Sequence, residues 1–367
     1  MPQKLSQFMY GSKFIESNID VYVEDYGTID SNSTNTAAVN NGQIFQKAFN
    51  HVYKMRFSSD GAITCTIWCP PGDYYLGDST KLNLADYYPI NFNHPQAANI
   101  VVSSTVELDW ANRPSNSNLS NASSVTNRYN LLSSFYQTRF HFSRNGISGR
   151  NLQFYDRAYS LNGSFNPVEG TKSGFRNIGF FGRYDGSPGT FNGSSNFYAR
   201  GLIGSLRVEK CCFHGFGAIT ANPGFSYVTA TDGWGIGNVG SGSIDAYDIQ
   251  IVDCMRGLVA ESGGAVRTFG NCSIIHNKES GIVAADNGII YFAGEGSGYI
   301  SNSSNFGAHA FSRGTIRFGY NSTHNILSSG STSIRVDTKG LITGQSGTVS
   351  YSSSENVSGG DGMILFR

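Results

Sequence analysis

The sequence predicts an all-β fold in which short strands, three per coil, wind into coils that stack in parallel. The first observation is composition: 45 of the 367 residues are Gly, 13% are aromatic and only 14% are charged. This composition is typical of short strands separated by turns, since disordered segments and long helices are richer in charge. The second is a repeat: Gly264, Gly288, Gly314 and Gly340 each precede two mostly apolar residues, at spacings of 24, 26 and 26 residues. A fixed period of this length indicates stacked repeats.

Two further sets of short apolar runs keep this period. The runs are 257–260, 281–284 and 307–310 in one set, and 249–251, 273–275 and 299–300 in the other. Each repeat therefore holds three segments too short for helices, and stacking would pair them into three parallel sheets around one apolar column. Asp253, Asn277 and Asn302 recur near one corner, where Asn tolerates a left-handed backbone. The alternative is a β-sandwich with irregular hairpins, which the regular period disfavours.

The N-terminal third has a different pattern. The only helix expected in the chain is amphipathic and lies around residues 40–56, with its apolar face plugging the open end of the column. Residues 112–128 and 156–171 are expected to be polar loops.

Earlier coils are expected to start at Gly174, Ser205 and Ser243. The extra residues between these starts predict external loops, at 183–201 and 219–242.

Four parts are expected along the chain. They are an N-terminal attachment arm at 1–20, the start of the stack with its capping helix at 21–80, the stack with external loops at 81–345, and a closing segment at 346–367.

The six Cys form no CxxC pair and fit no zinc pattern, so we expect buried free thiols, no metal and no cofactor. Equal numbers of acidic and basic residues, 26 each, argue against nucleic-acid binding. No apolar run has the length of a membrane span.

The N-terminal motifs resemble a known family. VEDYG at 23–27, a helix ending near FNHVYK at 49–54 and TIWCPPGDYYL at 66–76 are similar to the start of the pectate-lyase superfamily. The superfamily consists of right-handed parallel β-helices and is common in bacteriophage tailspikes. The resemblance covers residues 21–78, and the repeats extend it to about 345. The chain departs from the family in an Asn-rich linker, where Asp is commoner, and in its long insertions.

The resemblance implies a right-handed single-stranded parallel β-helix. It also implies a parallel homotrimer in the virion tail, assembled in the host cytoplasm and attached to other tail proteins through the N-terminal arm. Enzymes of the superfamily cleave polysaccharides as lyases or hydrolases. Polygalacturonase-type enzymes carry several motifs of which only His214-Gly215 is present here.

Glycoside hydrolysis needs two carboxylates about 5–9 Å apart, and acidic residues on adjacent coils could form such a pair. The candidates are Glu209, Asp232, Asp245, Asp248, Asp253 and Glu261. Each of them also has a plain interpretation as a surface or turn residue. A glycan-binding cluster is expected at Trp234, Tyr227, Asp232 and Tyr184, since aromatic rings stack on sugars while carboxylates bind hydroxyls. The alternative for Trp234 is that it only anchors its loop to the wall of strands.

The leading hypothesis is a bacteriophage tail fibre or tailspike that binds host surface polysaccharide, with or without cleaving it. The low charge favours neutral sugars or protein neighbours as partners. The alternative is a polysaccharide lyase or glycoside hydrolase outside a virion. For that alternative an export signal would be expected, and the N-terminus shows no apolar segment of that kind. A purely structural virion component is the weaker alternative.

Overall fold

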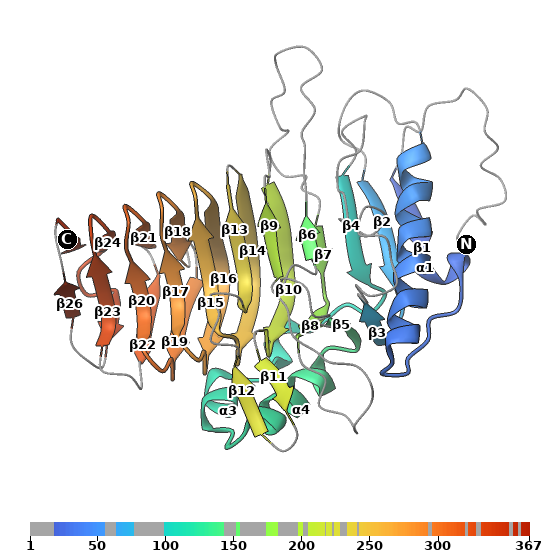
Figure 1. The fold of residues 1–367 in the computed structure, drawn as a ribbon, viewed down its shortest axis with the longest axis horizontal. Helices are drawn as coiled ribbons and strands as arrows, with labels where there is room; N and C mark the ends of the chain where they lie inside the picture. The colour runs from blue at the N-terminus through green and yellow to red at the C-terminus, as the bar shows by residue number, and fades with distance from the viewer. Residues whose placement is uncertain are drawn as a thin grey trace, which may run out of the picture.

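The computed structural model is a long stack of strands with a helix at its N-terminal end (Figure 1). It describes residues 18–55, 64–76, 99–142, 152–154, 174–182, 197–200, 205–216, 218–221, 224–227, 233–240, 242–292, 296–319, 322–327, 332–351, 355–358 and 361–367. The chain is mostly β, and its large sheets consist of parallel strands.

The C-terminal strands follow one another at short intervals. They are β17 (Ser280–Ala284), β18 (Ile289–Phe292), β19 (Gly296–Ser301), β20 (Phe306–Ala310), β21 (Thr315–Phe318), β22 (Thr323–Leu327), β23 (Thr332–Asp337), β24 (Leu341–Gly344), β25 (Val349–Tyr351), β26 (Glu355–Ser358) and β27 (Met363–Phe366). From β17 to β24, each strand pairs in parallel with the third strand after it. Three strands therefore make one repeat, and strand pairing continues past residue 345.

The register confirms the predicted glycine repeat. Ala265, Ile289, Thr315 and Leu341, which follow the four repeat glycines, pair with one another in sequence. The glycines themselves are needed for close approach: a Cβ on Gly288 would lie 2.0 Å from the carbonyl oxygen of Ala260, one repeat earlier.

The earlier strands are less regular in length. They are β1 (Ile19–Tyr22), β2 (Thr64–Cys69), β3 (Gly72–Leu76), β4 (Asn99–Ser104), β5 (Thr138–Phe142), β6 (Leu152–Phe154), β7 (Gly174–Arg176), β8 (Gly179–Phe181), β9 (Phe197–Arg200), β10 (Ser205–His214), β13 (Trp234–Val239), β14 (Ser243–Val252), β15 (Arg256–Glu261) and β16 (Ala265–Ile275). Strands β10, β14 and β16 are long because each turns a corner through one left-handed residue: Lys210, Asp248 or Gly270, with φ of 49°, 54° and 68°. Each of them therefore fills two strand positions of its repeat.

Two of the predicted alignments need adjustment. Ser205 pairs with Ser243 as expected, but Gly174 pairs with Arg207, two residues further along. At the next corner the left-handed residues are Asp253, His276 and Asn302, with φ of 57°, 56° and 56°. Asn277 was expected at that corner but follows it. It is buried, and its side-chain oxygen accepts a hydrogen bond from the backbone N–H of Cys254 at 3.1 Å.

The capping helix α1 (Asn35–Lys54) begins five residues before its predicted start, because Thr34 caps it by accepting a hydrogen bond from the Ala37 N–H. Its apolar face is buried against the core, and the ring of Phe45 packs edge-on against Tyr74 and Phe140. Figure 1 shows α1 standing beside β1 and β2 at the N-terminal end of the stack.

The prediction of a single helix and of polar loops at 112–128 is wrong. This part of the chain forms the 3-10 turn η3 (Trp110–Asn112), α3 (Asn116–Asn121) and α4 (Val125–Phe135), and a further 3-10 turn, η2 (Val23–Tyr26), follows β1. Ser115 and Ser124 cap α3 and α4, so residues that resemble a loop in composition are helix starts. The predicted loop at 219–242 contains the antiparallel hairpin β11 (Ala218–Ala221) and β12 (Gly224–Tyr227), and also the stacked strand β13.

One apolar core runs through the stack and contains five of the six cysteines; the sixth, Cys212, lies in a second cluster beneath α3 and α4. All six are free and buried, which confirms the prediction of free thiols. Burial raises the pKa of Cys65, Cys211 and Cys272 to about 12. No helix in the described part of the chain is long and apolar enough to cross a membrane.

Candidate functional site

The candidate site is the outer surface of β18, of β21 and of the parts of β10, β14 and β16 that precede their corners (205–209, 243–247 and 265–269), which we call the open face. Side chains alternate along a strand, so Leu206 and Val208 point into the core while Arg207 points outward. By register, Arg207 is followed in the outward column by Asp245, Arg267, Tyr291 and Arg317. All of these except Asp245 are at least partly exposed.

A second outward column lies beside the first. Glu209 pairs in register with Tyr247, and Tyr247 with Phe269. The two rings stack with centroids 4.6 Å apart and planes 18° from parallel, and the Arg207 guanidinium lies 4.2 Å from the centre of the Tyr247 ring. Arg207 and Phe269 come from the strands on either side of Tyr247, so both of its ring faces are covered and the ring presents its edge.

Ion pairs and hydrogen bonds hold the polar side chains of the open face in place. Arg267 binds Asp245 through two hydrogen bonds, Nε to Oδ1 at 2.7 Å and Nη2 to Oδ2 at 3.0 Å. Asp245 is 1% exposed, so its carboxylate lies beneath the guanidinium. Arg207 pairs with Glu209 at 3.0 Å, and Arg317 donates to the Tyr291 hydroxyl at 3.3 Å. The face is therefore a set of fixed hydrogen-bonding groups, as specific binding requires.

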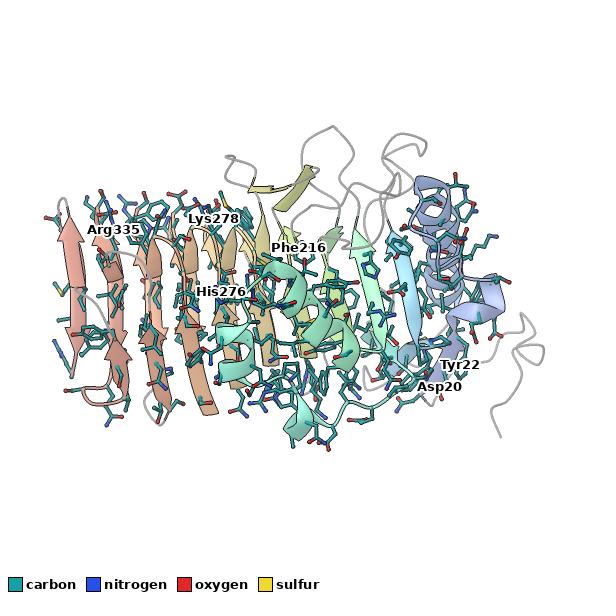
Figure 2. All side chains as sticks on the ribbon, turned by 90° about the horizontal axis from the view of Figure 1, so that it is seen from below. Asp20, Tyr22, Phe216, His276, Lys278 and Arg335 are labelled. Atoms are coloured by element: carbon teal, nitrogen blue, oxygen red, sulfur yellow. The ribbon has the colours of Figure 1, made fainter. Side chains whose placement is uncertain are left out.

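Figure 2 relates this face to the rest of the stack. Asp20 belongs to the same outward column, through Thr66, Val101 and Gly174. In the picture, Asp20 lies on the side of the stack opposite Arg335, which comes from β23 in the second sheet. The outer surface of the second sheet is therefore separate from the open face.

Two predicted catalytic residues lie together on the open face. Glu209 and Asp245 are on neighbouring strands, two residues apart in register, so their Cα atoms are about 8 Å apart from strand spacing and rise. Each carboxylate is paired with an arginine, Glu209 with Arg207 and Asp245 with Arg267. The pair suits binding better than proton transfer, because general acid catalysis needs a protonated carboxyl group.

Asp253 has a structural role. Its carboxylate receives two hydrogen bonds of 2.7 Å from Arg128 of α4, and His214 Nε2 lies 3.2 Å away without hydrogen-bond geometry. Burial alone would raise the pKa of Asp253, but His214 and Arg128 hold it below its ordinary value. Asp253 is 1% exposed, so a polysaccharide cannot reach its carboxylate. Its role is to bind α4 to the strands.

The other candidates are dispersed. Asp248 occupies the left-handed corner of β14 and accepts a hydrogen bond from the Asn271 N–H at 2.9 Å. Glu261 ends β15 in the second sheet, with Arg256 Nη1 3.7 Å away. Neither lies on the open face.

The predicted glycan cluster lies mostly outside the described residues. Tyr184 and Asp232 are not among them, and Tyr227 is described only as backbone in β12. Trp234 is 7% exposed and packs against Val259 and Val283 at the start of β13. This placement matches the alternative in which Trp234 anchors its segment to the wall of strands.

Sequence reasoning missed the arginines and tyrosines of the open face, although the repeat contained a signal for them. Arg267, Tyr291, Arg317 and Thr343 each stand three residues after a repeat glycine. Since the first residue after each glycine pairs in register, the third also points outward in one column. Comparing this position across repeats would have revealed the column.

The described residues contain no group of three or more His, Cys, Asp and Glu side chains that could hold a metal ion. Compared with models of protein families, with curated proteins and with solved structures, the chain matches none of them.

Proposed function

We propose that the chain is a right-handed single-stranded parallel β-helix of the tailspike type, related to the pectate-lyase superfamily. Pairing between every third strand and the helix at the N-terminal end support this assignment. Parallel strands joined by a crossover are connected in the right-handed sense in nearly all known cases. The homotrimer, the attachment arm and the location in a virion tail belong to the same proposal.

We further propose that the protein binds host cell-surface polysaccharide through the open face. The supporting observation is the in-register column of arginine and tyrosine, fixed by ion pairs and ring contacts. Side chains already held in one geometry lose little conformational entropy when a ligand binds. Guanidinium and phenol groups supply the donors and acceptors that sugar hydroxyls need.

A binding measurement on immobilised polysaccharides tests this proposal. The panel contains bacterial lipopolysaccharide, dextran, hyaluronan and polygalacturonate. The unaltered chain should bind at least one of them, and Tyr291→Ala should weaken that binding about tenfold, the effect of losing one good contact. Phe306→Ala removes a partly exposed ring from the second sheet and serves as the matched control. Binding to none of the panel, or equal loss in both variants, would contradict the proposal.

Cleavage is a second candidate, favoured only by the proximity of Glu209 and Asp245. An enzyme would release oligosaccharides from the bound polymer, and Glu209→Gln or Asp245→Asn would abolish that release while the polymer still bound. Binding without any released oligosaccharide would leave adhesion as the function.

A further inference from the structure

We infer that the open face selects a linear polysaccharide that carries one acidic sugar in every two. This inference rests on the proposed function and adds the charge pattern of the ligand. The first column reads Arg207, Asp245, Arg267, Tyr291 and Arg317 on five consecutive strands of one sheet. Every second strand therefore presents a guanidinium group, and the residues between them are an acid and a neutral phenol.

The spacing of these strands sets the period of the ligand. Neighbouring strands lie about 4.8 Å apart, so successive arginines of the column are about 10 Å apart and the three span about 19 Å. In an extended polysaccharide, each sugar adds a length close to one strand spacing. A chain lying along the stack axis would therefore place every second sugar beside an arginine.

The acidic residue among these five positions does not break this positive pattern. Asp245 is 1% exposed and is covered by its two hydrogen bonds to Arg267, so it faces the protein rather than the ligand. The side chains of Arg207 and Arg267 are 33% and 38% exposed. Arg317 is more exposed, and within the described residues it is in no ion pair. Arg267 and Arg207 keep their bonds to Asp245 and Glu209 and offer a ligand only their remaining N–H groups. In the described part of the chain, Arg317 bonds only the Tyr291 hydroxyl, through Nη1, so it can bind a ligand carboxylate with paired hydrogen bonds.

Three polymers of different charge period test the inference. Hyaluronan has one carboxylate in every two sugars, polygalacturonate has one in every sugar, and dextran has none. At equal chain length we expect hyaluronan to bind at least tenfold more tightly than dextran and more tightly than polygalacturonate. Its affinity should fall steeply as salt is raised, since exposed charges are screened.

Arg317→Ala provides the variant test, because the side chain is exposed and its loss leaves the core intact. It should weaken hyaluronan binding about tenfold, the effect of losing one charged contact, and weaken dextran binding less, because dextran loses only a hydroxyl contact. The matched control is Arg335→Ala, which removes an arginine from the second sheet. The melting temperature of both variants checks that they are folded.

The outcomes separate the two proposals. If dextran binds as tightly as hyaluronan and Tyr291→Ala weakens both, the open face binds polysaccharide but the charge pattern is wrong. If polygalacturonate binds more tightly than hyaluronan, or if Arg317→Ala and Arg335→Ala have equal effects, the alternating pattern is also wrong. If the unaltered chain binds no polymer of the panel, the proposed function fails together with the inference.

Discussion

Two outer faces of the same stack have opposite chemistry. On the open face the outward residues are arginine, tyrosine and aspartate, and they bond to one another across the strands. On the other, which we call the covered face, Phe181, Val252 and Ile275 point outward beneath α3 and α4. The two helices lie across the strands in Figure 2. The β-sheet is the same on both faces, so the outward residues decide whether a face is covered or left available for binding.

The covered face is joined to its helices by polar links as well as by apolar packing. The Ser120 carbonyl of α3 accepts hydrogen bonds from His276 and Asn302, and the buried Gln250 side chain donates to the Pro114 carbonyl at 2.7 Å. Buried polar groups are costly unless they are paired, so these links fix where the helices sit. The comparison predicts that stability resides on the covered face and binding on the open face.

The largest expected effect comes from removing Arg128. In Arg128→Ala the Asp253 carboxylate stays buried without its guanidinium partner, and breaking a buried pair in this way costs about 3–5 kcal/mol of unfolding free energy. Urea unfolding followed by circular dichroism measures the loss. The double variant Arg128→Met with Asp253→Asn removes both charges and should recover part of it. A loss below about 1 kcal/mol in Arg128→Ala would show that α4 contributes little.

The apolar contact under α4 comes next. Leu132 is fully buried against the strands, so Leu132→Ala should cost about 2–5 kcal/mol through lost burial and the cavity left behind. Asn130→Ala, at an exposed position of the same helix, is the matched control and should change stability by less than about 0.5 kcal/mol. The free energy of unfolding of the two variants separates packing from helix propensity. Equal effects would mean that the helix is not held by its apolar face.

The two faces also differ in how far the sequence predicts them. The stack could be predicted because Gly264, Gly288, Gly314 and Gly340 are local signals with a fixed period. The helical cover could not, because α3 and α4 are short and polar, and their apolar residues gain a meaning only against strands far along the chain. Arg128 and Asp253, for example, are 125 residues apart. The open face is an intermediate case. The sequence shows that its residues recur at one position of the repeat, but only the strand register shows which of them lie side by side.

Acid should weaken the folded chain, because several of its histidines are buried. Burial lowers the pKa of His141, which pairs in register with Phe181 of the covered face, and of His276, which bonds α3. It also lowers the pKa of His309 and His324 elsewhere in the stack, so all four bind a proton less readily when folded than when unfolded. An unfolded histidine protonates near pH 6.5. Stability is therefore complete above about pH 6.5 and declines as the pH falls below it. The pKa values of Asp73 and Asp253 are lowered, so their contribution persists until the pH falls below about 4, the unfolded aspartate pKa.

Urea unfolding at pH 7, 6 and 5 measures this decline. A double variant, His141→Gln with His276→Gln, should lose less stability than the unaltered chain between pH 7 and pH 5, whatever its stability at pH 7. The two outward columns of the open face, from β10 to β21, contain no histidine, so Arg317→Ala should decline with pH like the unaltered chain. Equal declines in the double variant and the unaltered chain would exclude these two histidines as the cause.

The smallest expected effect is on the stability of open-face variants. Arg317→Ala and Tyr291→Ala remove partly or largely exposed side chains joined by one 3.3 Å hydrogen bond and a ring contact of 5.3 Å. Exposed contacts of this kind contribute about 0–1 kcal/mol. Calorimetry should therefore find melting temperatures near that of the unaltered chain, while polysaccharide binding falls. If either variant loses more than about 2 kcal/mol, the arginine–tyrosine column stabilises the stack itself. The open face would then stabilise the fold, as the covered face does, and its fixed geometry would no longer support a binding role.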